Sequence, residues 1–236
     1  MRPDMADTIA KVRAEKLTYL SERCLQDLSD AVLHADRAHL RGMIIEAGTA
    51  LGGSAIVMAR AKSPRRLLRV YDAFAMIPPP SDKDGADVHE RYATIASRAA
   101  KGIGGSTYYG YRDDLLGEVT RSFARFGVPV ESSNVELIKG YFEQTLQVDG
   151  PVALAHLDGD WYESTMTCLR RIEPHLVPGG RLIIDDYYKW SGCRRAVDEY
   201  FDGRDGYEFV KHGRLHIVKD AAPSRWGRWR PWRRRG

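Results

Sequence analysis

The sequence has few cysteines and no long run of apolar residues. Its three cysteines, Cys24, Cys168 and Cys193, stand far apart, without a CxxC pair. This spacing argues against a disulfide scaffold or a zinc site and suits a reducing compartment, so we expect a cytoplasmic protein. No apolar run reaches the roughly 18 residues that a membrane-spanning helix needs. The polar first residues lack the apolar core of a secretory signal.

Acidic residues are absent from residues 221–236, which hold six arginines and three tryptophans. The rest of the chain has 30 basic and 32 acidic residues, so the formal net charge of +4 comes from this segment. We therefore expect no nucleic-acid partner for the body of the protein. Arginine combined with tryptophan can bind an anionic membrane surface, so peripheral membrane contact is one interpretation of the segment. A solvated tail is the other.

Apolar residues follow two patterns along the chain. Residues 6–40 have helical spacing, and short apolar runs alternate with helical patterns after residue 42. This alternation predicts an α/β, Rossmann-like fold, with a seven-stranded, mostly parallel sheet and helices on both faces. We expect a helical extension over 1–40, one α/β domain over 41–220 and a basic tail over 221–236. The predicted strands are 43–45, 67–71, 135–138, 152–157, 182–184, 207–211 and 214–219, and the predicted helices are 53–62, 86–100, 114–126, 141–147, 162–175 and 192–202.

A loop rich in proline, aspartate and glycine follows the second predicted strand. It covers residues 77–85 and reads IPPPSDKDG. A loop in this place can close over a ligand at the sheet edge, or it can be a surface excursion. The sequence leaves both interpretations open.

A glycine-rich turn follows the first strand, with the pattern E-x-G-x-x-x-G-G-S from Glu46 to Ser54. Ala50 stands where a dinucleotide-binding turn has its second glycine, which favours S-adenosylmethionine over a ligand with a pyrophosphate. Asp72 ends the second strand, where an acid can accept both ribose hydroxyls. Glu46 can face the cofactor's ammonium group. The alternative is that Gly48 and its neighbours only permit close helix–strand packing.

Four more acids follow the fourth and fifth strands: Asp158, Asp160, Asp185 and Asp186. Because the carboxyl ends of parallel strands share one edge, these acids are expected to converge there. Converging carboxylates repel one another unless a cation lies between them, and Mg²⁺ prefers oxygen ligands. The alternative is that they cap the following helices, which suits Asp160 best.

From Glu46 to about Tyr200 the chain resembles the macrocin O-methyltransferase family, which methylates deoxysugars of macrolide antibiotics. The resemblance implies a class I methyltransferase fold, S-adenosylmethionine, Mg²⁺ and a sugar or glycoside acceptor. It implies metal ligation by Asp158, Asp185 and Asp186, and cofactor contacts from Glu46, Gly48, Ser54 and Asp72. The chain is also similar to the sugar 1-O-methyltransferases of mycobacterial methylmannose polysaccharide synthesis. It departs from the family in a short segment before the first strand and in Ala73, where serine is common. The matching motifs are 46–54, YDAF at 71–74, LDGDWYEST at 157–165, PGG at 178–180, IDDY at 184–187 and GCRRAVDE at 192–199.

The general base is less well defined by the sequence. Catechol-type relatives place a lysine three residues after the strand-four metal ligand, and this position is Trp161 here. Candidates for the base are Asp158, Asp160, Lys189 and His216, and His156 is expected to be structural. A catechol-like diol as acceptor, and a binding protein without catalysis, are the competing interpretations. A homodimer formed through the apolar surface of 6–40 is a further expectation.

Overall fold

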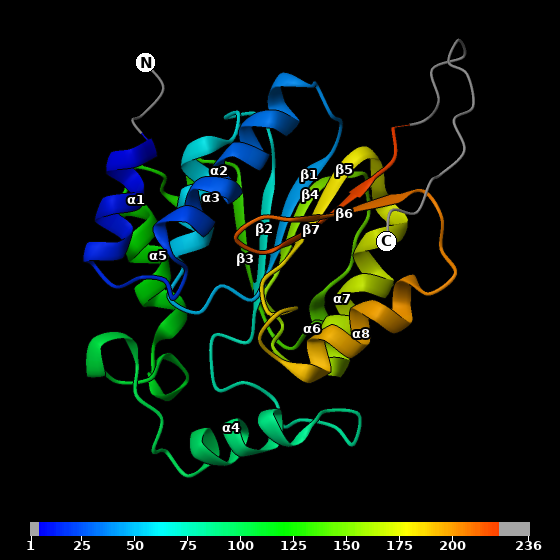
Figure 1. The fold of residues 1–236 in the computed structure, drawn as a ribbon. Helices are drawn as coiled ribbons and strands as arrows, with labels where there is room; N and C mark the ends of the chain where they lie inside the picture. Colours follow the sequence, from blue (N-terminus) through cyan, green and yellow to red (C-terminus); the bar gives the residue numbers. More distant parts are fainter. Residues whose placement is uncertain (1–4, 222–236) are drawn as a thin grey trace.

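The computed structural model describes residues 5–221, so the predicted basic tail lies, apart from its first residue, outside the described residues. Seven strands form one sheet in the order β3-β2-β1-β4-β5-β7-β6 (Figure 1). Strands β1 to β5 are parallel, and β7 runs antiparallel to both β5 and β6. This order confirms the predicted fold. The strands are β1 (Met43–Ala47), β2 (Leu68–Asp72), β3 (Val135–Lys139), β4 (Val152–Leu157), β5 (Leu176–Ile184), β6 (Tyr207–Lys211) and β7 (Leu215–Lys219).

Helices cover both faces of the sheet, because successive residues of each buried strand point to opposite sides. Ile44 and Leu154 join a core with α1, α2, α3 and α5, whereas Ile45 and Ala155 join a second core with α7 and α8. Figure 1 shows these two helical layers on either side of the sheet. The helices are α1 (Met5–Ala14), α2 (Glu22–Arg37), α3 (Gly53–Ala61), α4 (Ala86–Ala96), α5 (Leu115–Arg125), α6 (Phe142–Thr145), α7 (Tyr162–Ile172) and α8 (Ser191–Phe201).

The two N-terminal helices share the first core with the sheet. Ile9 and Val12 of α1, and Leu25 and Leu28 of α2, are almost completely buried within the chain. The apolar surface that was expected to form a dimer is therefore used inside the chain. Among the helices in residues 5–221, none is both long and apolar enough to span a membrane.

Strand β5 is longer than the sequence suggested. Its predicted start was residue 182, but the strand begins at Leu176 and continues through Pro178, Gly179 and Gly180. Gly179 has a φ of +78°, and the register of the β4–β5 pair shifts between Val152 and Leu154. The glycines that indicate a turn therefore form an irregularity inside the strand.

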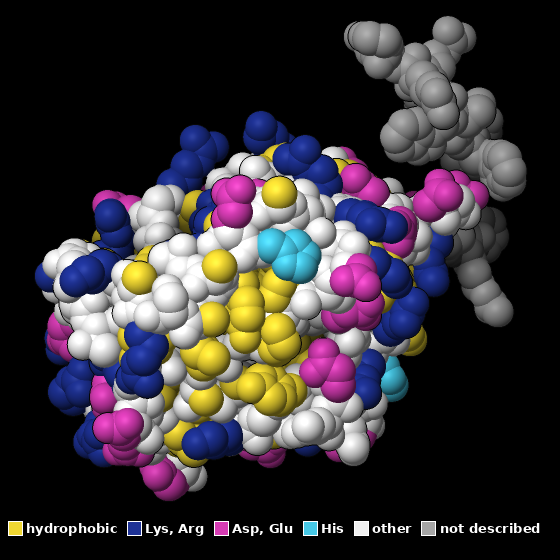
Figure 2. Space-filling view, turned by 90° about the horizontal axis from the view of Figure 1, so that it is seen from below, with side chains coloured by type: hydrophobic (Ala, Val, Ile, Leu, Met, Phe, Trp, Pro, Cys, Tyr) yellow, Lys and Arg dark blue, Asp and Glu magenta, His cyan; other side chains and the backbone are white. Residues whose placement is uncertain are grey.

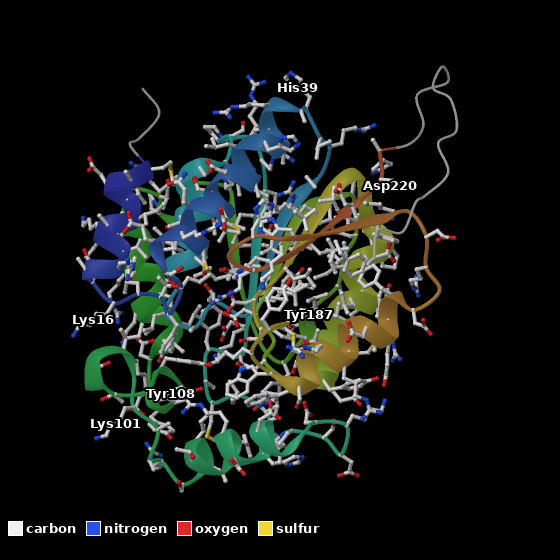
Figure 3. All side chains as sticks on the ribbon, in the orientation of Figure 1. Lys16, His39, Lys101, Tyr108, Tyr187 and Asp220 are labelled. Carbon is white, nitrogen blue, oxygen red and sulfur yellow. The ribbon has the colours of Figure 1, made fainter. Side chains whose placement is uncertain are left out.

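Helix α4 lies across the carboxyl ends of the parallel strands (Figure 1). Tyr108 lies between α4 and the rest of the fold, and Tyr187 follows β5 near the middle of the molecule (Figure 3). Seen from the α4 side, hydrophobic side chains gather at the centre of the face, with acidic and basic side chains around them (Figure 2). Helix α4 and the segments that flank it thus cover the carboxyl edge of the sheet.

Candidate active site

The glycine turn between β1 and α3 brings the backbones of two strands into contact. Gly48 has a φ of +91°, and a Cβ at this position would lie 1.9 Å from the carbonyl oxygen of Asp158. Ala50 has a φ of +49° and Gly52 a φ of +86°. Position 50 thus keeps the left-handed backbone that glycine favours, although it carries a side chain. The carboxyl ends of β1 and β4 can approach this closely only because residue 48 lacks a side chain.

Asp72 holds the same turn from the neighbouring strand. Its Oδ2 accepts hydrogen bonds from the backbone N–H groups of Thr49 (2.7 Å) and Ala50 (3.1 Å), and its Oδ1 accepts one from Phe74 (2.6 Å). Burial raises the pKa of Asp72, and the three backbone donors oppose this shift. With two acceptor sites on each oxygen, only Oδ1 keeps a free site beside these donors. The predicted ribose contact must therefore use that oxygen.

Glu46 is completely buried on β1. Its Oε1 lies 3.0 Å from Nδ1 of His156, whereas its Oε2 has no hydrogen-bond partner among residues 5–221. An unsatisfied buried carboxylate oxygen is costly, so it fits a donor supplied by a ligand. Ser54 is buried in the first turn of α3. Gly48 and Asp72 line the pocket of the site, whereas Glu46 and Ser54 are not among its lining residues.

A pocket of about 570 Å³, including its part open to solvent, connects the glycine turn with the acids after β4. Its walls include Ile77 and Pro78 after β2, Tyr109, and Tyr141 and Phe142 after β3. Ile77 and Pro78 belong to the loop 77–85, for which closure over a ligand was one of two interpretations, whereas Tyr109, Tyr141 and Phe142 were not in the predicted site. The signal for Tyr141 and Phe142 was available, since they follow β3 at the same edge of the sheet as Asp72.

Three acids converge at one end of this pocket. One carboxylate oxygen each of Asp158, Asp160 and Asp186 lies within 4.8 Å of the other two. Asp160 has a left-handed φ of +54°, and its Oδ1 accepts a hydrogen bond from Nε1 of Trp190 (3.1 Å). The residues before α7 and α8 are Trp161 and Trp190, and neither helix has a side-chain cap at this position. The interpretation of these acids as helix caps is therefore wrong.

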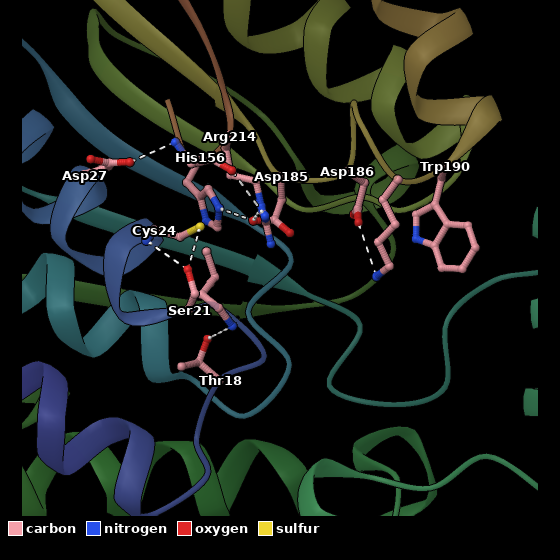
Figure 4. A network of polar contacts seen from close by, with 12 residues as sticks. Thr18, Ser21, Cys24, Asp27, His156, Asp185, Asp186, Trp190 and Arg214 are labelled. Atoms are coloured by element: carbon pink, nitrogen blue, oxygen red, sulfur yellow. Dashed lines mark hydrogen bonds and ion pairs between the residues drawn. The ribbon is translucent and has the colours of Figure 1, made fainter. Parts of the chain in front are cut away.

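Asp185 points away from this cluster. Its Oδ1 accepts a hydrogen bond from Nε of Arg214 (2.7 Å) and lies 3.5 Å from Nε2 of His156 (Figure 4). Burial opposes ionisation of Asp185, but His156 and Arg214 outweigh it and lower its pKa to about 2. The structure thus places Asp160, rather than the predicted Asp185, beside Asp158 and Asp186. Adjacent residues after a strand point to opposite faces, which is why only one of the two neighbouring acids joins the cluster.

His156 links the cofactor side of the sheet to Asp185. Its two ring nitrogens face Glu46 and Asp185, and burial, which disfavours its charge, is outweighed by these two carboxylates. The pKa of His156 is raised to about 9 as a result. A buried row of alternating charges, from Glu46 through His156 and Asp185 to Arg214, therefore braces β1, β4, β5 and the β6–β7 hairpin.

His216 lies outside the acidic cluster. It is buried on β7, its Nδ1 lies 3.0 Å from Arg181, and its ring packs on His212. Burial and the charge of Arg181 lower its pKa to about 3. A catalytic role for His216 is not supported by this position. Lys189, by contrast, lies 3.5 Å from Oδ1 of Asp186 (Figure 4).

The acidic cluster has the electrostatic properties of a cation site. Burial, followed by repulsion among the neighbouring carboxylates, raises the pKa of Asp158 and Asp186 and raises that of Asp160 to about 8. Oδ2 of Asp186 has no hydrogen-bond partner in residues 5–221. Hard oxygen donors with unbalanced negative charge fit Mg²⁺ better than a softer metal.

The stability of the metal-free protein is expected to fall as the pH rises from 6.5 to 8. The pKa of Asp160 is raised from its ordinary value of 3.8 to about 8 in the folded protein. Between these pH values the folded state binds more protons than the unfolded state, so its stability falls as the pH rises. The raised pKa of His156 stabilises the fold below 6.5, and this contribution is lost towards pH 9. Because Asp160 is partly exposed, we expect a loss of about 1 kcal/mol in the free energy of unfolding.

Denaturant titrations in EDTA at the two pH values measure this loss. Asp160→Asn should flatten the dependence, and excess Mg²⁺ should restore stability at pH 8 by neutralising the cluster. A metal-free protein that is more stable at pH 8 than at pH 6.5 contradicts this account.

The strand order, the glycine turn and the acid after β2 define a class I, S-adenosylmethionine-dependent methyltransferase. The model of the macrocin-O-methyltransferase (TylF) family matches residues 10–210, and the chain belongs to this family. It is therefore an S-adenosylmethionine-dependent O-methyltransferase, as the sequence motifs predicted.

Proteins of similar sequence and structure support the family assignment. The chain is 32% identical over 206 residues to an 8-demethyl-8-(2,3-dimethoxy-alpha-L-rhamnosyl)-tetracenomycin-C 4'-O-methyltransferase of Streptomyces olivaceus. This match covers 84% of this chain and 69% of that protein. The chain is 32% identical over 195 residues to the mycinamicin III 3''-O-methyltransferase of Micromonospora griseorubida, covering 78% and 70%. The solved structure of the O-methyltransferase NovP superposes with a TM-score of 0.70 at 26% identity, covering 87% and 82%.

Proposed function

We propose that this enzyme methylates a sugar hydroxyl of a glycosylated small molecule, with Mg²⁺ held by Asp158, Asp160 and Asp186. The observation that carries the proposal is the position of the acidic cluster at the end of the cofactor pocket. The name of the Streptomyces olivaceus relative describes O-methyl transfer to a rhamnosyl-tetracenomycin, which supports a sugar acceptor.

The residues of this chain would divide the work as follows. Glu46, Gly48, Ser54 and Asp72 bind the cofactor, with the free Oε2 of Glu46 accepting from its ammonium group. When bound, the cation supplies positive charge that makes the acceptor hydroxyl more acidic. Asp160 accepts the proton of that hydroxyl through Oδ2, the carboxylate oxygen to which Trp190 does not donate. Trp190 orients Asp160 through its indole N–H.

Aromatic side chains form one side of the mouth of the site. Tyr109 lines the pocket, and the ring of Tyr19 meets it edge to face, with 6.3 Å between the centroids. Tyr19 is 52% exposed and Trp190 lies against the acidic cluster. Flat apolar rings pack well against the C–H faces of a sugar. These residues, absent from our predicted site, are proposed to contact the acceptor.

A catechol-like acceptor is less well supported by the site. Trp161 occupies the position of the lysine in catechol-type relatives, is 2% exposed and donates its indole N–H to the carbonyl of Pro78 (2.9 Å). A buried indole has no basic atom with which to take a proton. This leaves the carboxylates and Lys189, which lies 3.5 Å from Oδ1 of Asp186, as the titratable groups at the cluster.

The proposal is tested by incubating the protein with S-adenosylmethionine and two acceptor panels, one of rhamnosides and other deoxyglycosides and one of catechols. Mass spectrometry should detect methylated glycosides, and EDTA should abolish the product until Mg²⁺ is restored. Methyl transfer that survives exhaustive chelation contradicts the metal site but not the fold assignment. Cofactor binding without transfer to any acceptor would favour the binding-protein interpretation.

A further inference from the structure

The segment 78–87, which we call the strap, runs from the loop after β2 into the first turn of α4, over the carboxyl edge of the sheet (Figure 1). The sequence left open whether it closes over a ligand or is a surface excursion. In the structure it is bonded to the first residues of two helices, α7 and α8. These are the helices that follow the two acidic loops of the site.

Asp84 of the strap caps α7. It is 8% exposed, and its Oδ1 accepts a hydrogen bond from the backbone N–H of Tyr162 (2.8 Å), the first residue of that helix. Its Oδ2 accepts from the N–H (2.9 Å) and the hydroxyl (3.1 Å) of Ser81. Gly192 leaves room for this carboxylate, since a Cβ there would lie 1.8 Å from Oδ1. The cap that α7 lacks in its own sequence thus comes from the strap.

Asp87 makes the equivalent contact at α8. Its carboxylate accepts hydrogen bonds from the N–H (3.0 Å) and the hydroxyl of Ser191, the first residue of α8. Asp87 is exposed, whereas Asp84 is buried. The exposed cap is therefore the weaker of the two constraints, because water can replace it.

The strap also reaches the cofactor pocket. Pro78 lines that pocket and its carbonyl accepts the indole N–H of Trp161 (2.9 Å). Trp161 lies in the chain between Asp160, which belongs to the acidic cluster, and Tyr162, which Asp84 binds. Asp160 has a left-handed backbone, which a non-glycine residue keeps only when its surroundings impose it. The contacts on Trp161 and Tyr162 are next to this strained residue.

We propose that Asp84 is a positioning residue: by capping α7 it holds the loop from Asp158 to Trp161 in the conformation that binds the cation. The inference rests on the proposed function, because it assumes that this loop binds a metal. Since the same strap lines the cofactor pocket, cofactor binding and cation binding should strengthen each other by the same factor. Loss of Asp84 should remove this mutual effect.

The cap itself is tested first, in the absence of metal and cofactor. Amide hydrogen exchange of the full chain should speed up about tenfold or more at Tyr162 and its neighbours in Asp84→Ala. Asp84→Asn, which keeps one acceptor oxygen, should recover most of the protection. Ser81→Ala is the matched control, since it leaves in place the hydrogen bond that the N–H of Tyr162 donates to Asp84. Equal exchange at Tyr162 in the wild type and Asp84→Ala overturns the proposal.

The positioning role is then tested by binding. Free Mn²⁺ measured by electron paramagnetic resonance should show about tenfold weaker binding in Asp84→Ala, although Asp84 is not a proposed ligand. Titration of S-adenosylhomocysteine with and without Mn²⁺ should show mutual tightening in the wild type and in Ser81→Ala, and none in Asp84→Ala. Circular dichroism shows whether Asp84→Ala folds. If it does not, the comparison uses Asp84→Asn, which should bind Mn²⁺ more weakly than Ser81→Ala.

Three outcomes are informative. Wild-type affinity for Mn²⁺ in Asp84→Ala overturns the positioning role. The same loss in Ser81→Ala as in Asp84→Ala also overturns it, because the effect would then come from the strap as a whole. A wild-type protein that binds no Mn²⁺ contradicts both the proposed metal site and the positioning role, whereas the exchange experiment would still report on the cap.

Discussion

Asp158→Asn is expected to lower kcat/KM for methyl transfer by about a thousandfold, the effect of several kcal/mol of lost charge stabilisation. Asp158 is half-buried, with its backbone against Gly48 and its carboxylate beside the other two acids of the cluster. The neutral amide keeps the size of the side chain but removes one of the charges that hold the cation. Cation affinity and methyl transfer should fall together.

The same substitution should stabilise the metal-free protein. Burial and repulsion by the neighbouring carboxylates raise the pKa of Asp158, so its ionised form opposes folding at neutral pH. Thermal unfolding in EDTA should therefore show a higher Tm for Asp158→Asn than for the wild type. Asp205→Asn, at an exposed position outside the site, is the control and should change neither Tm nor activity. Activity within tenfold of the wild type in Asp158→Asn would contradict the proposed site.

Gly48→Ala is expected to destabilise the fold by about 3 kcal/mol or more and to weaken S-adenosylmethionine binding by about a hundredfold. The added Cβ would lie 1.9 Å from the carbonyl oxygen of Asp158, and the φ of +91° is unfavourable for any residue with a side chain. Backbone cannot move away as a side chain can, so β1 and β4 must separate. That separation also widens the pocket at the glycine turn.

Gly203→Ala is the matched control. Gly203 also has a positive φ, of +68°, but a Cβ added there would have no heavy atom within 4 Å. It should cost about 1 kcal/mol, the penalty of the backbone conformation alone. Urea unfolding measures both variants, and calorimetry with S-adenosylhomocysteine measures the cofactor effect. Equal losses in the two variants would show that close approach to Asp158 is not the reason for the glycine.

The residues at the carboxyl ends of the parallel strands were predictable from the sequence. A buried strand that ends in an acid or a glycine turn places that residue at the shared edge of a parallel sheet. This is why Gly48, Asp72, Asp158 and Asp186 reach the same pocket and its acidic end. The mostly parallel sheet followed from the alternation of strands and helices.

The choice between neighbouring acids was not predictable from the sequence. Asp185 and Asp186 are adjacent and chemically equivalent, yet Asp185 is bound by Arg214 and His156. Arg214 comes from the hairpin after α8, and no local pattern relates it to the fifth strand. The surroundings of His216 were not predictable for the same reason, since only the packing of β7 shows that Arg181 and His212 lie beside it.

The sequence by itself determined the class of protein, because the periodicity of apolar residues specifies the sheet and the residues at the strand ends specify its chemistry. Only the tertiary structure decided which acids face one another, and that the strap caps α7 through Asp84. Such contacts join residues far apart in the chain. Their partners depend on packing directions and on burial, which a linear pattern does not contain.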